Sequence, residues 1–274
     1  KARIKTIIVK ELKSIAEKYG QPRKSIIIYD DVARYEEETV EIPDYPVNLF
    51  FTKEGYFKKI TPQSLRMSGE QKLKDGDEII QELEFTNNCD LLFFTDKCQV
   101  YKAKADDFAQ TKASVLGDYV AAKLGFDEGE NAVKMVVTKD YKGMLLFAFE
   151  NGKAAKVPLE SYATKTNRKK LTGAYSDKSP LVGLLYMPED EEVLFKASSG
   201  NMLLVHTGAL ALKTTRSTQG VAVLKPKKGH RLFSIERYKD GTFTNPKRYR
   251  TGSLPARGAL PVNDDSKDEQ LSLI

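Results

Sequence analysis

The sequence predicts an all-β fold, a propeller-like array of about four to six small sheets that follows a short N-terminal helix. The main observation is a recurring pair of short apolar strands joined by a tight turn, which starts at Leu49, Leu92, Leu146 and Val193. Successive copies are 43, 54 and 47 residues apart. A period of this size, built from strand pairs, is typical of arrays in which one unit is too small to bury its own apolar face.

Residues 4–19 are expected to form the helix. Their apolar residues recur at three- and four-residue steps and therefore make one stripe along the helix. Gly20 and Pro22 follow, in the order that ends a helix. The stripe consists of Ile4, Ile7, Ile8, Leu12, Ile15 and Ala16.

The first strand pair, Leu49–Ile60, shows the repeating pattern. Its turn contains Gly55, because glycine adopts the positive φ that such turns need. An additional strand precedes each later pair, and we assign it to the pair that follows it. These additional strands are Ile79–Phe85, Val133–Val137 and Leu181–Tyr186. The leftover strands at Ile26–Tyr29 and Arg231–Ile235 could meet and close a ring, since closure removes exposed sheet edges.

The charge of the chain is unevenly distributed. The formal net charge is +6, and residues 165–257 carry 18 Lys and Arg against seven Asp and Glu. Residues 29–44 carry seven acids and one Arg. A local basic surplus indicates a surface for a polyanion. The chain has no run of 18 apolar residues, which argues against a membrane-spanning helix, and it begins at Lys1, which we interpret as the start of a fragment.

Residues suited to catalysis or metal binding form no convincing pattern. His206 and His230 are the two histidines of the chain, too few for a histidine-based metal site. No phosphate-binding glycine motif follows a predicted strand. Cys89 and Cys98 suit a reducing compartment, and we interpret them as packing residues.

The chemically meaningful feature is the set of cations in the long loops, each of which has a glycine: Gly69, Gly117, Gly173 and Gly220. Cations at one position in successive units would share an outer rim, where Lys and Arg bind the phosphates of a bent duplex without reading bases. The glycine would let the backbone approach a phosphate closely. The candidate DNA-binding residues are Arg66, Lys72, Lys74, Lys112, Lys165, Arg168, Lys169, Lys170, Lys213, Arg216, Lys225, Lys227 and Lys228. The second-strand lysines that would widen this patch are Lys58, Lys59, Lys102, Lys104 and Lys156.

The repeated unit at Leu49–Ile60, its later copies and Arg216–Leu224 resemble the C-terminal domain of type IIA topoisomerase A subunits, the family of gyrase A and topoisomerase IV A. Ala16–Ile27 is similar to the segment that leaves the coiled-coil arm of those subunits. The resemblance implies a β-pinwheel, a propeller-like ring whose blades exchange strands with their neighbours. It also implies a basic outer rim that binds and bends duplex DNA and presents it to the cleavage core.

The same resemblance implies how the chain is divided. Residues 1–24 would be the end of the coiled-coil arm with a linker, residues 25–249 the pinwheel, and residues 250–274 a flexible tail. The partners would be double-stranded DNA, an ATPase B subunit, and the rest of the polypeptide to which this domain belongs, with no membrane. This fragment would be no enzyme and would need no cofactor, whereas the parent enzyme would use ATP and magnesium in the cytoplasm, at the nucleoid.

One departure from the family pattern bears on the type of topoisomerase. Gyrases carry a glutamine-arginine-arginine-glycine-glycine box in the loop of the first blade. The matching loop here, Leu65–Gly76, keeps Arg66, Gly69 and Lys72 but lacks the box. This departure favours a topoisomerase IV-like member over a gyrase.

Two other classes of function remain open from the sequence. A propeller-like module could dock another protein without contacting DNA, and exposed aromatic patches would support that interpretation. A propeller enzyme would need a polar cluster at the centre of the ring, and the shortage of histidines makes that interpretation the weaker one.

Overall fold

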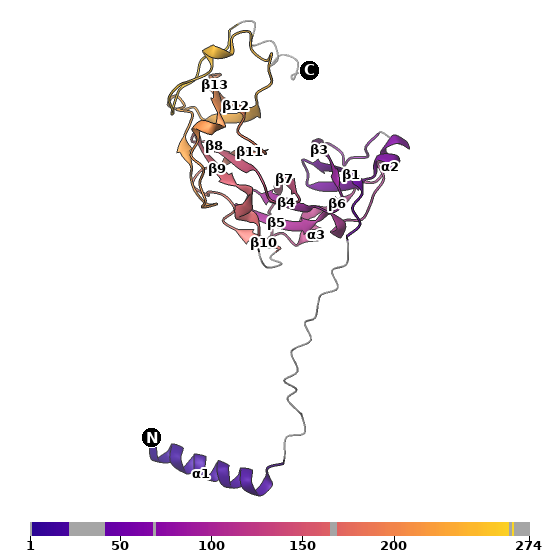
Figure 1. Ribbon diagram of the computed structural model, residues 1–274, viewed down its shortest axis with the longest axis vertical. Helices are drawn as coiled ribbons and strands as arrows, with labels where there is room; N and C mark the ends of the chain where they lie inside the picture. The colour runs from indigo at the N-terminus through magenta and orange to yellow at the C-terminus, as the bar shows by residue number, and fades with distance from the viewer. Residues whose placement is uncertain (1, 22–41, 68–69, 165–168, 263–264, 266–274) are drawn as a thin grey trace. The chain divides into compact units, whose positions relative to one another are not determined.

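The computed structural model describes residues 2–21, 42–67, 70–164, 169–262 and 265. The chain divides into two units, residues 1–41 and residues 42–274. In the first unit, helix α1 (Ala2–Tyr19, Figure 1) confirms the predicted helix. The apolar residues of its stripe are exposed. The predicted strand at residues 26–29 lies outside the described residues. No helix in the described part of the chain is both long and apolar enough to cross a membrane.

The described residues of the second unit form four antiparallel sheets, within the predicted range of four to six. The first sheet contains β1 (Pro46–Thr52), β2 (Tyr56–Ile60), β3 (Ile79–Thr86) and β6 (Asp118–Tyr119). The second contains β4 (Asp90–Thr95), β5 (Gln99–Lys104), β7 (Ala132–Thr138) and β10 (Lys170–Thr172). The third contains β8 (Met144–Phe149), β9 (Lys153–Pro158), β11 (Leu181–Met187) and β14 (Val221–Ala222). The fourth contains β12 (Glu192–Ala197), β13 (Met202–His206) and β15 (Leu232–Arg237).

The sheets exchange strands, and this corrects the predicted grouping. The order β3-β1-β2-β6 shows that the strand before each later hairpin pairs with the hairpin that precedes it, because β3 pairs with β1 and β7 with β4. The strand at Arg231–Ile235 is therefore not left over, since β15 pairs with β12. We call the edge formed by β3, β7, β11 and β15 the inner edge. We call the edge beyond β2, β5, β9 and β13 the outer edge. In Figure 1, β7 and β11 face the concave side of the row of sheets, and β10 faces the convex side.

The central hairpin strands are apolar on both faces because they lie between two cores. Along β4, Leu91 and Phe93 pack in the core between the first and second sheets, whereas Leu92 and Phe94 pack in the core between the second and third. Successive side chains of a strand point to opposite faces, so a run of apolar residues is what a sheet inside a stack requires. Aromatic rings fill these cores, with Phe57 and Phe108 at a centroid distance of 4.6 Å.

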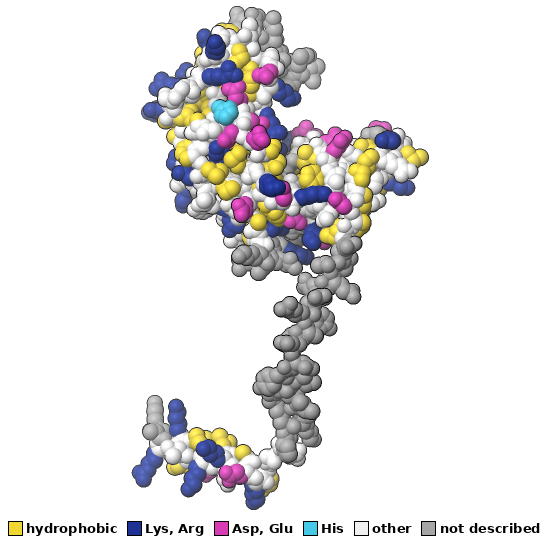
Figure 2. All heavy atoms as spheres, viewed as in Figure 1, with side chains coloured by type: hydrophobic (Ala, Val, Ile, Leu, Met, Phe, Trp, Pro, Cys, Tyr) yellow, Lys and Arg dark blue, Asp and Glu magenta, His cyan; other side chains and the backbone are white. Residues whose placement is uncertain are grey.

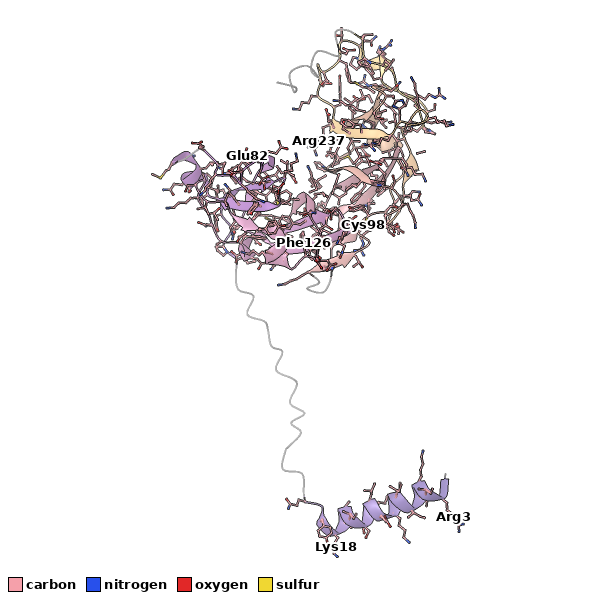
Figure 3. All side chains as sticks on the ribbon, turned by 180° about the vertical axis from the view of Figure 1, so that it is seen from behind. Arg3, Lys18, Glu82, Cys98, Phe126 and Arg237 are labelled. Atoms are coloured by element: carbon pink, nitrogen blue, oxygen red, sulfur yellow. The ribbon has the colours of Figure 1, made fainter. Side chains whose placement is uncertain are left out.

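The hairpin turns share one backbone feature. Gly55, Gly152 and Gly200 have φ of 84°, 79° and 79°, and Cys98 occupies the same position in the second hairpin with φ of 56° (Figure 3). The prediction for Gly55 is confirmed, and Cys98 is a side chain in a conformation that usually requires glycine. Both cysteines are free thiols.

The end of the described chain completes the fourth sheet. Residues Arg250 and Ala259 form bridges with Leu204 and Met202 of β13, and Tyr249 is buried against the same sheet. The sequence predicted a flexible tail from residue 250, and in the structure Arg250 and Ala259 of this segment pair with β13. Residues 263–264 and 266–274 lie outside the described chain.

Candidate nucleic-acid interface

Three loops line the outer edge, and each begins with a short 3-10 helix: η1 (Ala105–Asp107), η2 (Leu159–Tyr162) and η3 (Thr207–Ala209). Each loop runs back along the outer hairpin strand of the preceding sheet and ends in β6, β10 or β14. The backbone ties are alike: Thr111 N donates to Lys59 O at 2.8 Å, and Lys213 N donates to Lys156 O at 2.8 Å. Equivalent loops therefore recur at equivalent places on successive sheets.

Several predicted cations lie in these outer-edge loops. Lys112, Lys169 and Lys213 come from the first, second and third loops; Lys112 and Lys169 are exposed, and Lys213 is half-buried. Lys169 O accepts a hydrogen bond from Lys102 N at 2.7 Å, which fixes its backbone against β5. Arg216 is half-buried, with its guanidinium 5.8 Å from the centre of the Tyr162 ring.

The cations of the first predicted loop are more dispersed. Lys72 lies beside the outer edge, because its backbone N donates to Ala113 O at 2.9 Å. Arg66 is exposed on α2 (Pro62–Met67). Lys74 instead pairs with Glu54 of the hairpin turn at 3.5 Å.

The other predicted cations differ in how available they are. Lys170 is held by both oxygens of Asp127 at 2.8 and 2.7 Å, and this hydrogen bonding lowers the pKa of Asp127. Lys170 is therefore already neutralised. Lys225, Lys227 and Lys228 are exposed beyond β14, whereas Lys165 and Arg168 lie outside the described residues.

The loop glycines have a different role from the predicted one. A Cβ on Gly117 would lie 2.4 Å from Phe57 O, and one on Gly220 would lie 1.9 Å from Ala154 O, so these residues pack against the protein's own backbone. Gly173 follows β10 and has nothing within 4 Å of its Cβ position, so it is not equivalent to them. Gly258 is the equivalent that sequence reasoning missed, with 2.4 Å from its Cβ position to Met202 O. Gly69 lies outside the described residues.

Second-strand lysines tie neighbouring sheets together, which corrects the idea that they widen the basic patch. Lys59, Lys102 and Lys156 occupy the same position in β2, β5 and β9, and Lys59 and Lys156 are buried. Lys58 is also buried, with its ammonium donating to Lys72 O at 2.6 Å. These ammonium groups are therefore unavailable to a ligand, whereas Lys104 is exposed.

Each of the three equivalent lysines reaches the 3-10 helix that follows the next hairpin. Lys59 Nζ donates to Ala105 O at 2.7 Å, Lys102 Nζ to Tyr162 O at 3.2 Å, and Lys156 Nζ to Thr207 O at 2.9 Å. We call these contacts the lysine ties. In the fourth sheet, Leu204 occupies the same position. The described part of the chain has no later hairpin to which a lysine at this position could be tied.

The side chains around the lysine ties differ from sheet to sheet. Asn87 Oδ1 accepts from Lys59 at 2.6 Å, the ring of Tyr141 lies 4.8 Å from the Lys102 ammonium, and Asp190 pairs with Lys156 at 2.9 Å. Burial lowers the pKa of Lys59 and Lys102, because a charged ammonium loses its hydration there. Hydrogen bonding from Lys156 lowers the pKa of Asp190.

Figure 2 shows how the charged side chains of the second unit are distributed over one face. Lys and Arg side chains are frequent along the outer margin of the third and fourth sheets, whereas Asp and Glu are common on the concave side. Figure 3 shows the concave side from behind, with Glu82 of β3 and Arg237 of β15 near the inner edge. In the described part of the chain, no three His, Cys, Asp or Glu side chains are grouped so as to hold a metal ion.

Known proteins share this fold and part of this sequence. The chain is 25% identical over 280 residues to the DNA gyrase A protein of Metamycoplasma arthritidis, covering 94% of this chain and 31% of that protein. It is 25% identical over 211 residues to the DNA topoisomerase 4 A protein of Staphylococcus aureus, covering 75% and 26%. The chain is a C-terminal domain of the type IIA topoisomerase A-subunit family. It spans about a third of the length of the curated relatives it matches.

Solved structures show the same fold for this topoisomerase domain. The crystal structure of the C-terminal domain of a DNA topoisomerase IV aligns with a TM-score of 0.62 at 24% identity, over 72% of this chain and 62% of that one. A DNA gyrase A C-terminal domain aligns with a TM-score of 0.53 at 18% identity, over 78% and 76%. The predicted β-pinwheel is therefore confirmed. No family model matches the chain.

Proposed function

We propose that the outer edge of this topoisomerase domain binds duplex DNA through its phosphates and bends it. The observation that supports this most is the recurrence of the outer-edge loops, which carry Lys112, Lys169 and Lys213 on successive sheets. Cations repeated along the convex side of a curved row of sheets match a curved line of phosphates. Such binding needs no reading of base edges, so sequence preference would come from the ease of bending.

Replacing Lys112, Lys169 and Lys213 together with Gln should weaken duplex binding without lowering stability. Each phosphate contact contributes about 0.9 to the slope of log affinity against log salt, so the slope should become shallower by about two to three. Fluorescence anisotropy with a labelled duplex between low and moderate salt measures this change.

The control removes three cations from the segments between strands, with Lys139, Lys142 and Lys178 replaced by Gln. These side chains already pair with Asp44, Asp140 and Asp177, and the variant should keep the parent slope. A parent protein whose affinity does not change with salt would refute phosphate-dominated binding. Equal effects of the two triple variants would mean that Lys112, Lys169 and Lys213 contribute no more to binding than cations already paired with an acid.

We further propose that the parent enzyme is topoisomerase IV-like. The first-blade loop lacks the gyrase box. Its Arg66 lies in α2, whereas the backbone N of Lys72 donates to Ala113 O. In this proposal the domain presents DNA to the cleavage core, while magnesium and an ATPase B subunit serve the parent reaction in the cytoplasm. The fragment itself carries the DNA-binding step and no catalysis.

One observation favours a second candidate, the docking of another protein at the inner edge. Ile80, Val133 and Phe233 expose 40%, 39% and 67% of their surfaces on β3, β7 and β15. Exposed apolar side chains beside charged ones are typical of protein interfaces. Protein docking at this edge would be insensitive to the length of a duplex, which separates it from DNA bending.

A further inference from the structure

We propose that residues 242–259, the C-terminal segment, supply the fourth sheet's share of the DNA-binding outer edge. This inference rests on the proposed function and extends it to residues that the sequence assigned partly to a flexible tail. The segment takes the place that a loop returning from a fifth hairpin would occupy.

The backbone of the C-terminal segment repeats the geometry of the outer-edge loops. Arg250 forms a parallel bridge with Leu204 of β13, as Leu212 does with Lys156 of β9 and Gln110 with Lys59 of β2. Gly258 comes eight residues after Arg250 and packs against Met202 O. In the third loop, Gly220 comes eight residues after Leu212 and packs against Ala154 O in the same way. The C-terminal segment therefore lies on the fourth sheet as the third loop lies on the third sheet.

The C-terminal segment is held firmly enough to present side chains in fixed positions. Phe243 and Tyr249 are buried, and their ring centroids are 4.2 Å apart. Tyr249 OH donates to Asp265 Oδ2 at 2.6 Å, and Ala259 exchanges backbone hydrogen bonds with Met202 at 2.8 and 2.9 Å. A ligand that contacts this segment meets an ordered surface and does not have to order a tail.

Three cations of the C-terminal segment are exposed: Lys247 and Arg248 in the 3-10 helix η4 (Pro246–Arg248), and Arg257. None of the three forms an ion pair among the described residues, although Arg248 Nε donates to Leu260 O at 3.3 Å. Arg250 is different, because it donates two hydrogen bonds of 2.6 Å to Glu192 and is already neutralised. Phosphate oxygens are therefore suitable partners for Lys247, Arg248 and Arg257.

The C-terminal segment also joins the basic surface of the third sheet. Lys225 N donates to Ala256 O at 2.7 Å, and Ala256 N donates to Val223 O at 3.0 Å. Arg257 thus follows directly after Ala256, whose carbonyl oxygen accepts the hydrogen bond from Lys225 N. The cations beyond β14 and those of the C-terminal segment make one continuous strip across the boundary between the third and fourth sheets.

The test replaces Lys247, Arg248 and Arg257 with Gln in the full 274-residue chain and compares it with the Lys139, Lys142 and Lys178 control. We expect the slope of log affinity against log salt to become shallower by about two to three, as for three lost phosphate contacts. Hydroxyl-radical footprinting on a long duplex should show a protected region that is shorter at one end. Unfolding curves that match those of the parent would show that the fold is intact.

The outcomes separate this inference from the proposed function. A parent protein that binds DNA, together with a C-terminal-segment variant that keeps the control's slope and the full footprint, would overturn the inference and leave the proposed function standing. A parent protein with no salt-dependent affinity for duplex DNA would overturn both. A shortened footprint in this variant only would support the inference.

Discussion

Gly220→Ala is expected to lower the free energy of unfolding by about 3–4 kcal/mol. The new methyl group would lie 1.9 Å from Ala154 O and 2.6 Å from Ala155 Cα, both backbone atoms that cannot rotate away. The residue also has φ of 71°, which costs a side chain about 1–2 kcal/mol, and forced overpacking adds about 1–3 kcal/mol. Denaturant unfolding followed by circular dichroism measures the change.

Gly173→Ala is the matched control for the glycine substitution. Gly173 has φ of 61° but nothing within 4 Å of its Cβ position, so the same change should cost only the conformational term of about 1 kcal/mol. Equal losses in the two variants would show that the close approach of the third loop to β9 does not constrain Gly220. A much larger loss of unfolding free energy in Gly220→Ala than in Gly173→Ala would support close packing of the outer-edge loops against the strands.

Lys59→Met is expected to lower the free energy of unfolding by about 2–3 kcal/mol, although it removes a buried charge. The substitution leaves Asn87 Oδ1 without its donor and leaves Ala105 O with Phe108 N alone, and an unsatisfied buried acceptor costs about 1–3 kcal/mol. Relief of the ammonium's desolvation, seen in the lowered pKa of Lys59, offsets part of this loss. The same denaturant unfolding experiment measures the difference.

Lys104→Met is the control for Lys59, since Lys104 is exposed at the end of β5. A surface change of this kind should alter the free energy of unfolding by no more than about 0.5 kcal/mol. If Lys59→Met also has so small an effect, the lysine tie between the first and second sheets does not stabilise the array. Faster amide exchange in β1–β3 of the Lys59 variant would locate the loss at that boundary.

The repeated hairpins could be predicted from the sequence because they depend on local features. A run such as Leu91–Phe94 is apolar on both faces, and Gly55 marks a turn, so each copy is visible within about twelve residues. The pairing of β3 with β1 could not be predicted in the same way. A strand between two hairpins has the same pattern whichever neighbour it joins, and the choice depends on contacts across the whole unit.

The candidate site was only partly visible because charge does not indicate burial. Lys59, Lys156 and Lys112 look alike in the sequence, yet two tie sheets together and one is exposed. The recurrence of lysine at one hairpin position, ending at Leu204, was the available signal for a structural role. The role of the C-terminal segment could not be predicted because it pairs with β13 through isolated bridges. Its sequence therefore shows no alternation of apolar and polar residues that would mark a strand.

The measurement that tests the proposed DNA track most directly is the bend of bound duplexes of increasing length. Donor and acceptor dyes at the two ends of a duplex report its end-to-end distance, for lengths from about one helical turn to about four. The proposed function predicts that affinity rises with length and that the ends of the longer duplexes draw closer together on binding. Longer duplexes that bind no more tightly than the shortest and stay straight would contradict it.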